Sequence, residues 1–217
     1  MSLKKTKITT PGYHKRIGYH SMLVGGTALL ATVLLAAGDL STREAIAMRK
    51  AEDLQAMLTQ VIPSDIYDNN LLSDKFELAE KEIYQARMES KVSAVAFEVF
   101  EPGYSGVITL IMSVSSEGKL LGVRVISHTE TPGLGDKMET ARSNWILSFD
   151  GRSLNKENEK NWAVKKDGGE FDQFTGATIT PRAIIKAVKG GLVFFKNNKQ
   201  RLLSYEPPST SEGNKDE

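Results

Sequence analysis

An uninterrupted apolar stretch near the N-terminus is the strongest hydrophobic pattern in the chain. No Asp, Glu, Lys or Arg occurs between Arg16 and Asp39, and most residues between them are Leu, Val, Ala, Gly or Thr. About 20 such residues are enough for one helix to cross a bilayer. The pattern predicts a transmembrane helix at 17–38. A signal peptide cleaved within 34–38 is the alternative.

Charge on either side of this stretch predicts its orientation. Acidic residues soon follow it, whereas five basic residues precede it: Lys4, Lys5, Lys7, Lys15 and Arg16. Loops rich in Lys and Arg stay on the cytoplasmic side of a membrane. We therefore expect 1–16 in the cytoplasm and the rest of the chain outside.

The next pattern has helical spacing and predicts a stalk at 39–62, which could extend the membrane helix. Apolar residues recur at intervals of three and four, and they are Ala47, Ala51, Leu54, Leu58 and Val61. Residues 41–44 (Ser-Thr-Arg-Glu) have the spacing of a capping box, which predicts a helix start there. Pro63 predicts the end.

A folded domain is predicted at 63–203. Residues 64–90 are polar and mixed, so we expect mainly loop there. From Val92 onward apolar residues alternate, as at Val95, Phe97 and Val99, which predicts a strand. Two more strands are predicted at 107–114 and 120–126, separated from their neighbours by turns at 101–106 and 116–118.

Helical spacing and loops dominate after the third strand. We expect a helix over 136–149, a polar loop over 150–161, a short strand at 162–164 and a hairpin turn at 167–169. A last helix is predicted from about Pro181, with its apolar side formed by Ile184, Ile185, Val188, Leu192 and Phe195. Residues 204–217 have the composition of a disordered tail. Strands followed by helices predict an α+β domain of antiparallel strands with packed helices.

Composition narrows the chemistry. The formal net charge is +1, which argues against a nucleic-acid binder. There is no cysteine, so disulfides, cysteine-ligated iron–sulfur clusters and thiol catalysis are excluded. Of three histidines, His14 and His20 precede or enter the apolar stretch and only His128 falls in the folded domain, so we expect no metal centre.

The segment 171-FDQFTGATITPRAIIKAV-188 carries the candidate chemistry. Thr180 and Pro181 suit the N-cap and first position of a helix, which leaves Thr175, Gly176 and Thr178 unexplained. A helix N-terminus attracts phosphate through its unpaired N–H groups and its dipole. A hydroxyl just before it could contact a phosphate or be esterified to it. From the spacing alone, a helix cap and a phosphate site both stay open.

Residues 172–178 resemble the pattern Asp-x-x-(Ser/Thr)-Gly-Ala-(Thr/Ser) of FMN-binding domains. In that family a flavin transferase takes FMN from FAD and leaves it joined through its phosphate to the last hydroxyl residue. The resemblance implies FMN bound covalently to Thr178. It also implies that Asp172, Thr175 and Gly176 are recognition positions and that Ala177 and Thr180 lie in the site.

The resemblance extends over most of 92–200. The segments 103–106 (GYSG), 128–137 (HTETPGLGDK) and 162–183 look like the G subunit of the Rnf (Rsx) ion-translocating electron transport complex. The C subunit of the sodium-pumping NADH:quinone reductase shares the flavin motif, but it usually has Ser before Gly-Ala-Thr. Here Thr175 stands there and Ile-Thr-Pro follows at 179–181, which fits the Rnf form better.

This likeness implies a function and a location. The chain would be a single-pass protein of the bacterial inner membrane with a periplasmic FMN domain. It would relay electrons within a complex that couples transfer between ferredoxin and NAD to ion movement, as an electron-transfer subunit rather than a stand-alone enzyme. Its implied partners are the other membrane subunits and the flavin transferase.

The likeness also points to residues outside the motif. Thr131, Gly133 and Leu134 would lie beside the flavin, and Glu130 or His128 would hydrogen-bond to it. Lys165 would pair with the phosphate or the reduced ring. Each has a simpler explanation: a turn at 131–135, a satisfied surface histidine and a solvated strand end. Trp162 is expected in the core, and Tyr104 is placed to close over a ligand.

Three alternatives remain open from the sequence. The chain could be the C-type member of the quinone reductase, with different electron donors. It could be a non-redox, membrane-anchored interaction domain in which the TGAT motif only caps a helix. A threonine-nucleophile hydrolase is disfavoured because only His128 is available in the fold as its base.

Overall fold

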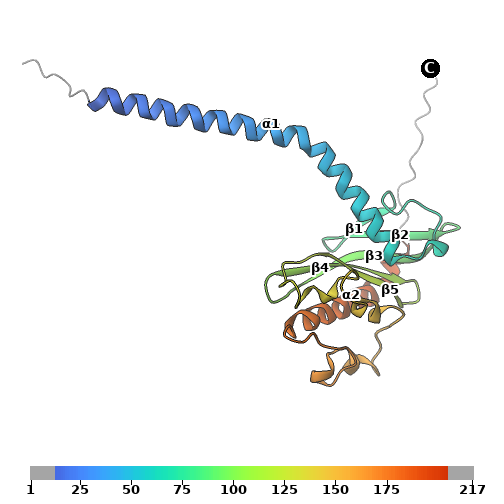
Figure 1. Cartoon of the computed structure of the whole chain (residues 1–217). Coiled ribbons are helices and arrows are strands. Elements are labelled where there is room, and N and C mark those ends of the chain that lie inside the picture. The colour runs from blue at the N-terminus through green and yellow to red at the C-terminus, as the bar shows by residue number, and fades with distance from the viewer. Residues whose placement is uncertain (1–12, 205–217) are drawn as a thin grey trace, which may run out of the picture. The chain divides into compact units, whose positions relative to one another are not determined.

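A computed structural model describes residues 13–204, with side chains from residue 18, and the chain divides into two compact units with their boundary between Lys50 and Ala51. Residues 1–12 and 205–217 lie outside the described residues. Most of the predicted cytoplasmic segment (1–16) and of the predicted disordered tail (204–217) therefore falls outside them. Figure 1 labels the elements along the chain, and each unit is described by itself.

Helix α1 (Tyr13–Val61) is one continuous helix of 49 residues. From Gly18 onward it is long and apolar enough to cross a membrane, as predicted. The predicted helix start at 41–44 is wrong. The hydroxyl of Ser41 donates to the carbonyl of Ala37 (2.8 Å) and that of Thr42 to the carbonyl of Gly38 (2.9 Å). These bonds back to the preceding turn are typical of a helix interior, so the hydroxyls cap nothing.

The folded unit contains one five-stranded antiparallel sheet in the order β1-β2-β3-β4-β5. Each strand pairs with the next one in sequence. Its strands are β1 (Lys75–Leu78), β2 (Lys81–Met88), β3 (Lys91–Pro102), β4 (Val107–Ser115) and β5 (Leu120–Ser127). The three strands predicted from alternation are confirmed as β3, β4 and β5, and the α+β class is confirmed with them (Figure 1).

The prediction of loop for 64–90 is wrong, because β1 and β2 lie there. The two hairpin turns gave no sequence signal. Their central pairs, Ala79-Glu80 and Glu89-Ser90, all have positive φ (49° to 65°) without a glycine or asparagine. Tight hairpins normally place those residue types at such positions. Strand β2 also buries a polar residue, Gln85, which breaks the apolar alternation.

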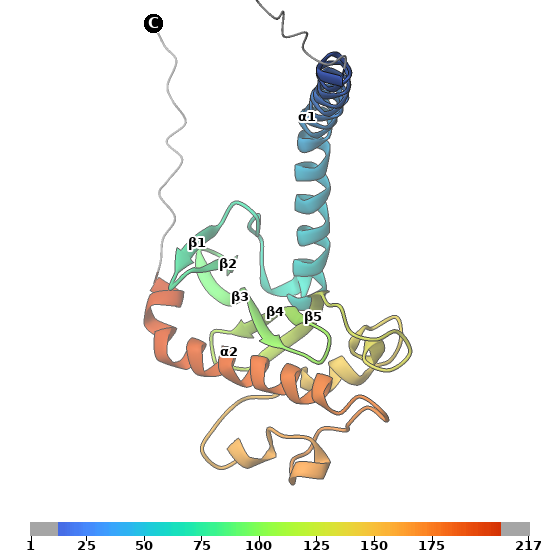
Figure 2. The same cartoon turned by 90° about the vertical axis from the view of Figure 1, so that its left-hand side faces the viewer.

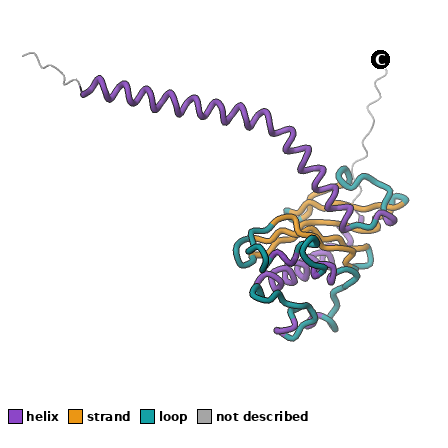
Figure 3. Tube along the Cα trace, in the orientation of Figure 1, coloured by secondary structure: helices purple, strands orange, loops and turns teal. Residues whose placement is uncertain are grey.

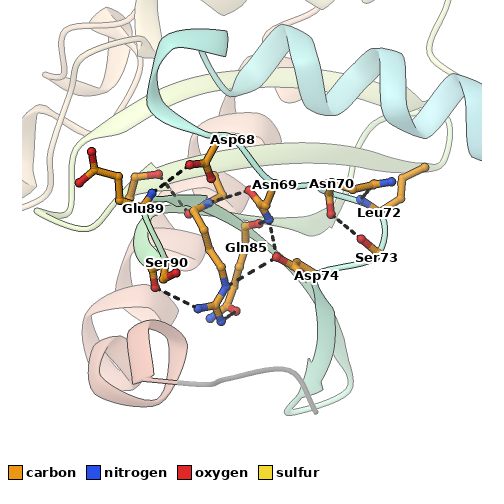
Figure 4. Close-up of polar contacts among 12 residues, drawn as sticks. Asp68, Asn69, Asn70, Leu72, Ser73, Asp74, Gln85, Glu89 and Ser90 are labelled. Atoms are coloured by element: carbon orange, nitrogen blue, oxygen red, sulfur yellow. Dashed lines mark hydrogen bonds and ion pairs between the residues drawn. The ribbon is translucent and has the colours of Figure 1, made fainter. Parts of the chain in front are cut away.

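A polar network holds the loop before β1 against β2 (Figure 4). The side-chain amide of Asn69 donates to Asp74 Oδ2 (2.6 Å) and to the carbonyl of Gln85 (2.9 Å). Asn69 Oδ1 accepts from the amide of Arg87 (2.8 Å). The loop thus satisfies backbone groups along β2, which explains how a polar stretch is ordered there.

Two separate cores cover the two faces of the sheet. On one face the last turns of α1 pack on β2, β3 and β4, with Leu58, Val61 and Ile62 buried. The hydroxyl of Ser113 donates to the carbonyl of Val61, and a Cβ added to Gly122 would lie 2.9 Å from Val61 Cα. The absence of a side chain at Gly122 is what lets α1 approach β5 this closely.

The other face is covered by helix α2 (Ile179–Ser204), which lies across it in Figure 2. The predicted apolar side is confirmed, since its five members are buried in this core: Ile184, Ile185, Val188, Leu192 and Phe195. Gly191 permits close packing, because a Cβ there would be 2.3 Å from Met112 Sδ.

Between β5 and α2 the chain is mostly loop (Figure 3). The helix predicted at 136–149 is replaced by two short 3-10 helices, Asp136–Met138 and Trp145–Phe149. Between them the Ser143 hydroxyl donates to the carbonyl of Lys137 (2.6 Å) and accepts from the amide of Trp145 (3.2 Å), which replaces helical bonding.

The short strand at 162–164 and the hairpin at 167–169 are also wrong. Val164 forms only a single parallel bridge with Phe171. A 3-10 turn, Lys165–Asp167, follows, and Gly168 (φ 83°) ends it. The polar loop predicted at 150–161 contains one more such turn, Glu159–Asn161.

Candidate cofactor site

One cavity of about 370 Å³ opens beside the N-terminus of α2. Three segments that are distant in sequence meet around it: the tip of the β3–β4 hairpin, the loop after β5, and the residues that lead into α2. Its lining residues are Tyr104, Glu130, Thr131, Leu134, Gly135, Gly176, Ala177, Thr178 and Ile179.

Thr178 occupies the position directly before α2. It is half-buried, lines the cavity, and is followed at once by Ile179, the first helical residue. The first N–H groups of a helix have no partner within it, and the dipole of α2 adds partial positive charge at this end. The Thr178 side chain therefore lies where an anionic group is favoured.

The prediction that Thr180 caps α2 is wrong. The helix begins two residues earlier than expected, so Thr180 lies inside its first turn and is fully buried. Its hydroxyl donates to Glu130 Oε2, whereas the oxygen of a cap accepts from an N–H of the first turn. Pro181 remains in the first turn, where a missing N–H costs no helical bond.

Gly176 shapes the floor of the cavity. Its φ is +83°, and a Cβ added there would lie 3.3 Å from Leu134 Cδ2. The turn that it forms is closed by the amide of Ala177, which donates to the carbonyl of Phe174 (3.2 Å). A side chain at 176 would strain the backbone and fill the space between the motif and Leu134.

We expect Gly176→Ala to slow the loading of a ligand into this cavity. The left-handed conformation should cost alanine about 1–2 kcal/mol of stability, and its methyl group narrows the cavity. Gly133→Ala is a matched control, because Gly133 has φ +80° but open space around its Cβ position. Urea unfolding should show similar losses for both variants. Equal loading by both would contradict the role given to Gly176.

Glu130 is a buried carboxylate, 5% exposed. Its Oε1 accepts from the amides of Tyr104 and Ser105 (2.8 Å each), and its Oε2 accepts from Thr180. One side chain thus contacts the hairpin tip and the first turn of α2.

His128 lies away from this cavity. It lines a second cavity of about 380 Å³ along β5. Its Nε2 is 2.8 Å from Glu139 Oε1, and its Nδ1 accepts from the amide of Glu130 (3.1 Å). Both ring nitrogens are engaged with protein groups, which agrees with a satisfied histidine rather than a ligand of the flavin.

Five predicted site residues do not line the cavity. Thr180 is buried, and the other four are exposed: Asp172, Thr175, Lys165 and Gly133. Asp172 and Lys165 form an exposed ion pair with each other (2.6 Å), so Lys165 is engaged with the motif's own carboxylate. Thr175 is exposed at the turn. These residues lie on the solvent side of the motif. The cavity also includes Gly135, which ends the run at 131–135 that was expected beside the flavin, and Ile179, which was not singled out from the sequence.

Aromatic side chains in and around residues 171–178 form one packed cluster. Phe149 and Phe171 stack with ring centroids 4.6 Å apart, and Trp145 meets Phe174 edge to face at 4.9 Å. Trp162 packs against Phe171 (5.6 Å) and is buried, which confirms it as a core residue. The indole N–H of Trp145 donates to the carbonyl of Asp172 (2.7 Å). The motif is therefore packed against the aromatic part of the core.

An ion pair joins the first turn of α2 to the 3-10 turn at 165–167. Arg182 in the first turn of α2 donates to both oxygens of Asp167 (2.6 Å each). This hydrogen-bonded guanidinium lowers the pKa of the Asp167 carboxyl. The Arg182 side chain is thereby held against the 3-10 turn at 165–167.

The cavity fits FMN on three counts. The N-terminus of α2 suits a phosphate, and the half-buried hydroxyl of Thr178 lies beside it. Gly176 leaves space beside Leu134, which offers an apolar contact to a flat ring. The volume falls in the range of about 300–1,000 Å³ that is usual for small-molecule sites.

Comparison with known proteins gives consistent matches. The model of the family "FMN-binding domain" matches residues 103–193. The G subunit of the ion-translocating oxidoreductase complex of Stutzerimonas stutzeri is 46% identical over 195 residues, 86% of each chain. The G subunits from Cereibacter sphaeroides (44%, 86% of this chain and 88% of that one) and Haemophilus influenzae (46%, 84% and 92%) are similar.

A solved structure, that of Shewanella oneidensis NqrC, is more distant. It is 21% identical, covers 67% of this chain and 73% of its own, and has a TM-score of 0.46. The sequence relatives, at more than twice that identity and over most of both chains, decide the family.

Proposed function

Because the chain belongs to the family of G subunits of the ion-translocating oxidoreductase complex, we propose that it is a membrane-anchored flavoprotein that relays electrons within such a complex. One observation carries the proposal: the half-buried hydroxyl of Thr178 lies at the N-terminus of α2 and opens into a cavity. Bound FMN accepts and passes on electrons, and the protein supplies its position and electrostatic surroundings.

The residues of the cavity have distinct parts in this function. Thr178 holds the phosphate, with the first N–H groups of α2 beside it. Gly176 and Leu134 border the space for the ring. Tyr104, which is 71% exposed at the hairpin tip, shields one side of the cavity mouth.

The link to Thr178 is proposed to be a phosphate ester, made by a separate flavin transferase from FAD. The Thr178 oxygen bonds to the phosphorus on the FMN side, the bond from that phosphorus to the bridging oxygen breaks, AMP leaves, and the hydroxyl proton goes to solvent. Asp172, Thr175 and Gly176 are exposed next to Thr178, so the transferase has access to the motif.

The proposed topology follows the charge pattern. Residues 1–16 lie in the cytoplasm, 17–38 cross the bacterial inner membrane, 39–62 form the stalk, and 63–203 form the periplasmic FMN domain, followed by a tail at 204–217. The basic residues before the span support this orientation. The proposed partners are the other membrane subunits, and a covalent link keeps FMN from diffusing away outside the cell.

A flavin label on the denatured full-length chain tests this function. We expect a fluorescent band after denaturing electrophoresis when the chain is expressed with an active transferase. The peptide that holds Thr178 should carry the mass of FMN less one water. A dark band and an unmodified peptide would contradict the proposal and favour a non-redox interaction domain. Mass spectrometry of co-purified subunits separates this complex from a sodium-pumping quinone reductase.

A further inference from the structure

The carboxylate of Glu130 joins the two sides of the cavity. Its Oε1 accepts two amide hydrogens from the β3–β4 hairpin tip, at Tyr104 and Ser105. Its Oε2 accepts the hydroxyl hydrogen of Thr180 in the first turn of α2. These partners are 25 to 50 residues away in sequence. Hydrogen bonds to an ionised acceptor are stronger than neutral ones, particularly in a buried site.

The Glu130 side chain is closely packed against two glycines. A Cβ added to Gly103 would lie 2.6 Å from Glu130 Oε1, and one added to Gly135 would lie 2.7 Å from Glu130 Cβ. Two glycines, Gly103 in the hairpin tip and Gly135 in the same loop as Glu130, therefore make space for a single side chain. The carboxylate of Glu130 is therefore packed and hydrogen-bonded within the protein, and its bonding oxygens are already engaged without a ligand.

The backbone of Glu130 is itself fixed. Its amide donates to His128 Nδ1 (3.1 Å), and His128 Nε2 bonds to Glu139 Oε1 (2.8 Å). Since Nδ1 accepts, the ring hydrogen of neutral His128 is on Nε2, which donates to Glu139. The loop after β5 is thus held at the point from which Glu130 reaches the other two segments.

We propose that Glu130 is the positioning residue of this cavity: its carboxylate clasps the hairpin tip to the first turn of α2 and so fixes Tyr104, which lines the same cavity as Thr178. Glu130 acts through its three protein donors and not through a charge contact with the flavin. The clasp itself stands on the contacts above, and its consequence for flavin attachment rests on the proposed function.

A conservative variant separates positioning from charge. In Glu130→Gln the amide oxygen can accept from Tyr104 and Ser105, while the NH₂ group donates to Thr180, whose hydroxyl can accept. Glu130→Ala removes all three bonds and leaves the buried Thr180 hydroxyl and two partly buried amides without this acceptor. We therefore expect glutamine to preserve the clasp without the charge and alanine to abolish it. Glu157→Ala, at an exposed loop glutamate, controls for the loss of one carboxylate.

The first readout is hydrogen exchange of the full-length chain in detergent, expressed without the transferase. For peptides that span 103–106, Glu130→Ala should lower amide protection about tenfold, because an amide bond to a charged acceptor is lost. Glu130→Gln should stay within about threefold of the unsubstituted chain. Unchanged protection in Glu130→Ala would overturn the clasp, and this readout does not depend on any flavin.

The second readout is the initial rate of flavin attachment with purified transferase and FAD. We expect Glu130→Ala to lose about tenfold or more, since small misplacements of a reacting group are costly, and Glu130→Gln and Glu157→Ala to stay near the unsubstituted rate. A Glu130→Gln variant that keeps the hairpin protected but attaches flavin as poorly as alanine would overturn the positioning role in favour of a charge contact. If the unsubstituted chain takes up no flavin, the proposed function fails, and the exchange readout still decides the clasp.

Discussion

We expect Thr178→Ala to abolish covalently bound flavin while leaving the fold intact. The substitution removes the only hydroxyl that lies directly before α2 and lines the cavity. Its side chain is half-buried and outside both cores, so stability should change by no more than ~1–2 kcal/mol, the range of a lost helix cap. In-gel fluorescence of the denatured chain, with peptide mass spectrometry, measures the loss, and circular dichroism checks the fold.

Thr180→Ala is the matched threonine control. It removes the hydrogen bond to Glu130 and should cost ~1–3 kcal/mol, the range for leaving a buried acceptor without its partner. Because Thr178 is untouched, the variant should still carry flavin after prolonged expression with the transferase. Covalent flavin on Thr178→Ala, or its complete loss from Thr180→Ala alone, would show that Thr178 is the wrong threonine.

The aromatic base of the motif should produce the largest stability effect. Phe149 is fully buried and contacts Trp145, Trp162 and Phe171. Replacing it by alanine removes these contacts and leaves a cavity, so Phe149→Ala should lower the free energy of unfolding by ~3–5 kcal/mol. Urea unfolding of the full-length chain, followed by tryptophan fluorescence, measures this loss.

Phe100→Ala provides the comparison for this variant. Phe100 lies on β3 and is 64% exposed, and its ring contact is with Lys81, whose ammonium is 5.3 Å from the centroid. Loss of such an exposed contact should cost ~1 kcal/mol or less. Similar losses for the two variants would show that the aromatic cluster contributes no more than a surface ring.

Sequence patterns predicted the elements whose residues follow a clear period. The apolar stretch after Arg16, the alternation at Val95, Phe97 and Val99, and the helical spacing from Ile184 to Phe195 each correspond to an observed element. A periodic pattern arises when one face of an element is buried and the other is exposed. A continuous apolar stretch arises when the whole element lies in an apolar environment. Strands β1 and β2 escaped prediction because Ala79-Glu80 and Glu89-Ser90 adopt left-handed turns that their residue types disfavour.

The candidate site was also predictable only in part, because some of its contacts join segments that are distant in sequence. The motif around Thr178 is contiguous, so its position before a helix was readable. The exact first residue of α2 was not, because Thr180-Pro181 is a good helix start and the tertiary bond from Thr180 to Glu130 favours an earlier one. The partners of Glu130 lie in two other segments, and no local spacing reveals a contact across 50 residues.

The strand order has a consequence for how the protein matures. Because every strand pairs with its sequence neighbour, the sheet can form hairpin by hairpin with small loop-closure costs, and such low contact order favours rapid folding. Helix α2 instead docks through distant contacts, Thr180 with Glu130 at one end and Leu202 with Gln85, 117 residues apart, at the other. Thr178 therefore acquires its surroundings only when α2 has docked. Under the proposed function, a partly synthesised or partly folded chain offers the transferase no complete substrate, so we expect flavin attachment to report completed folding.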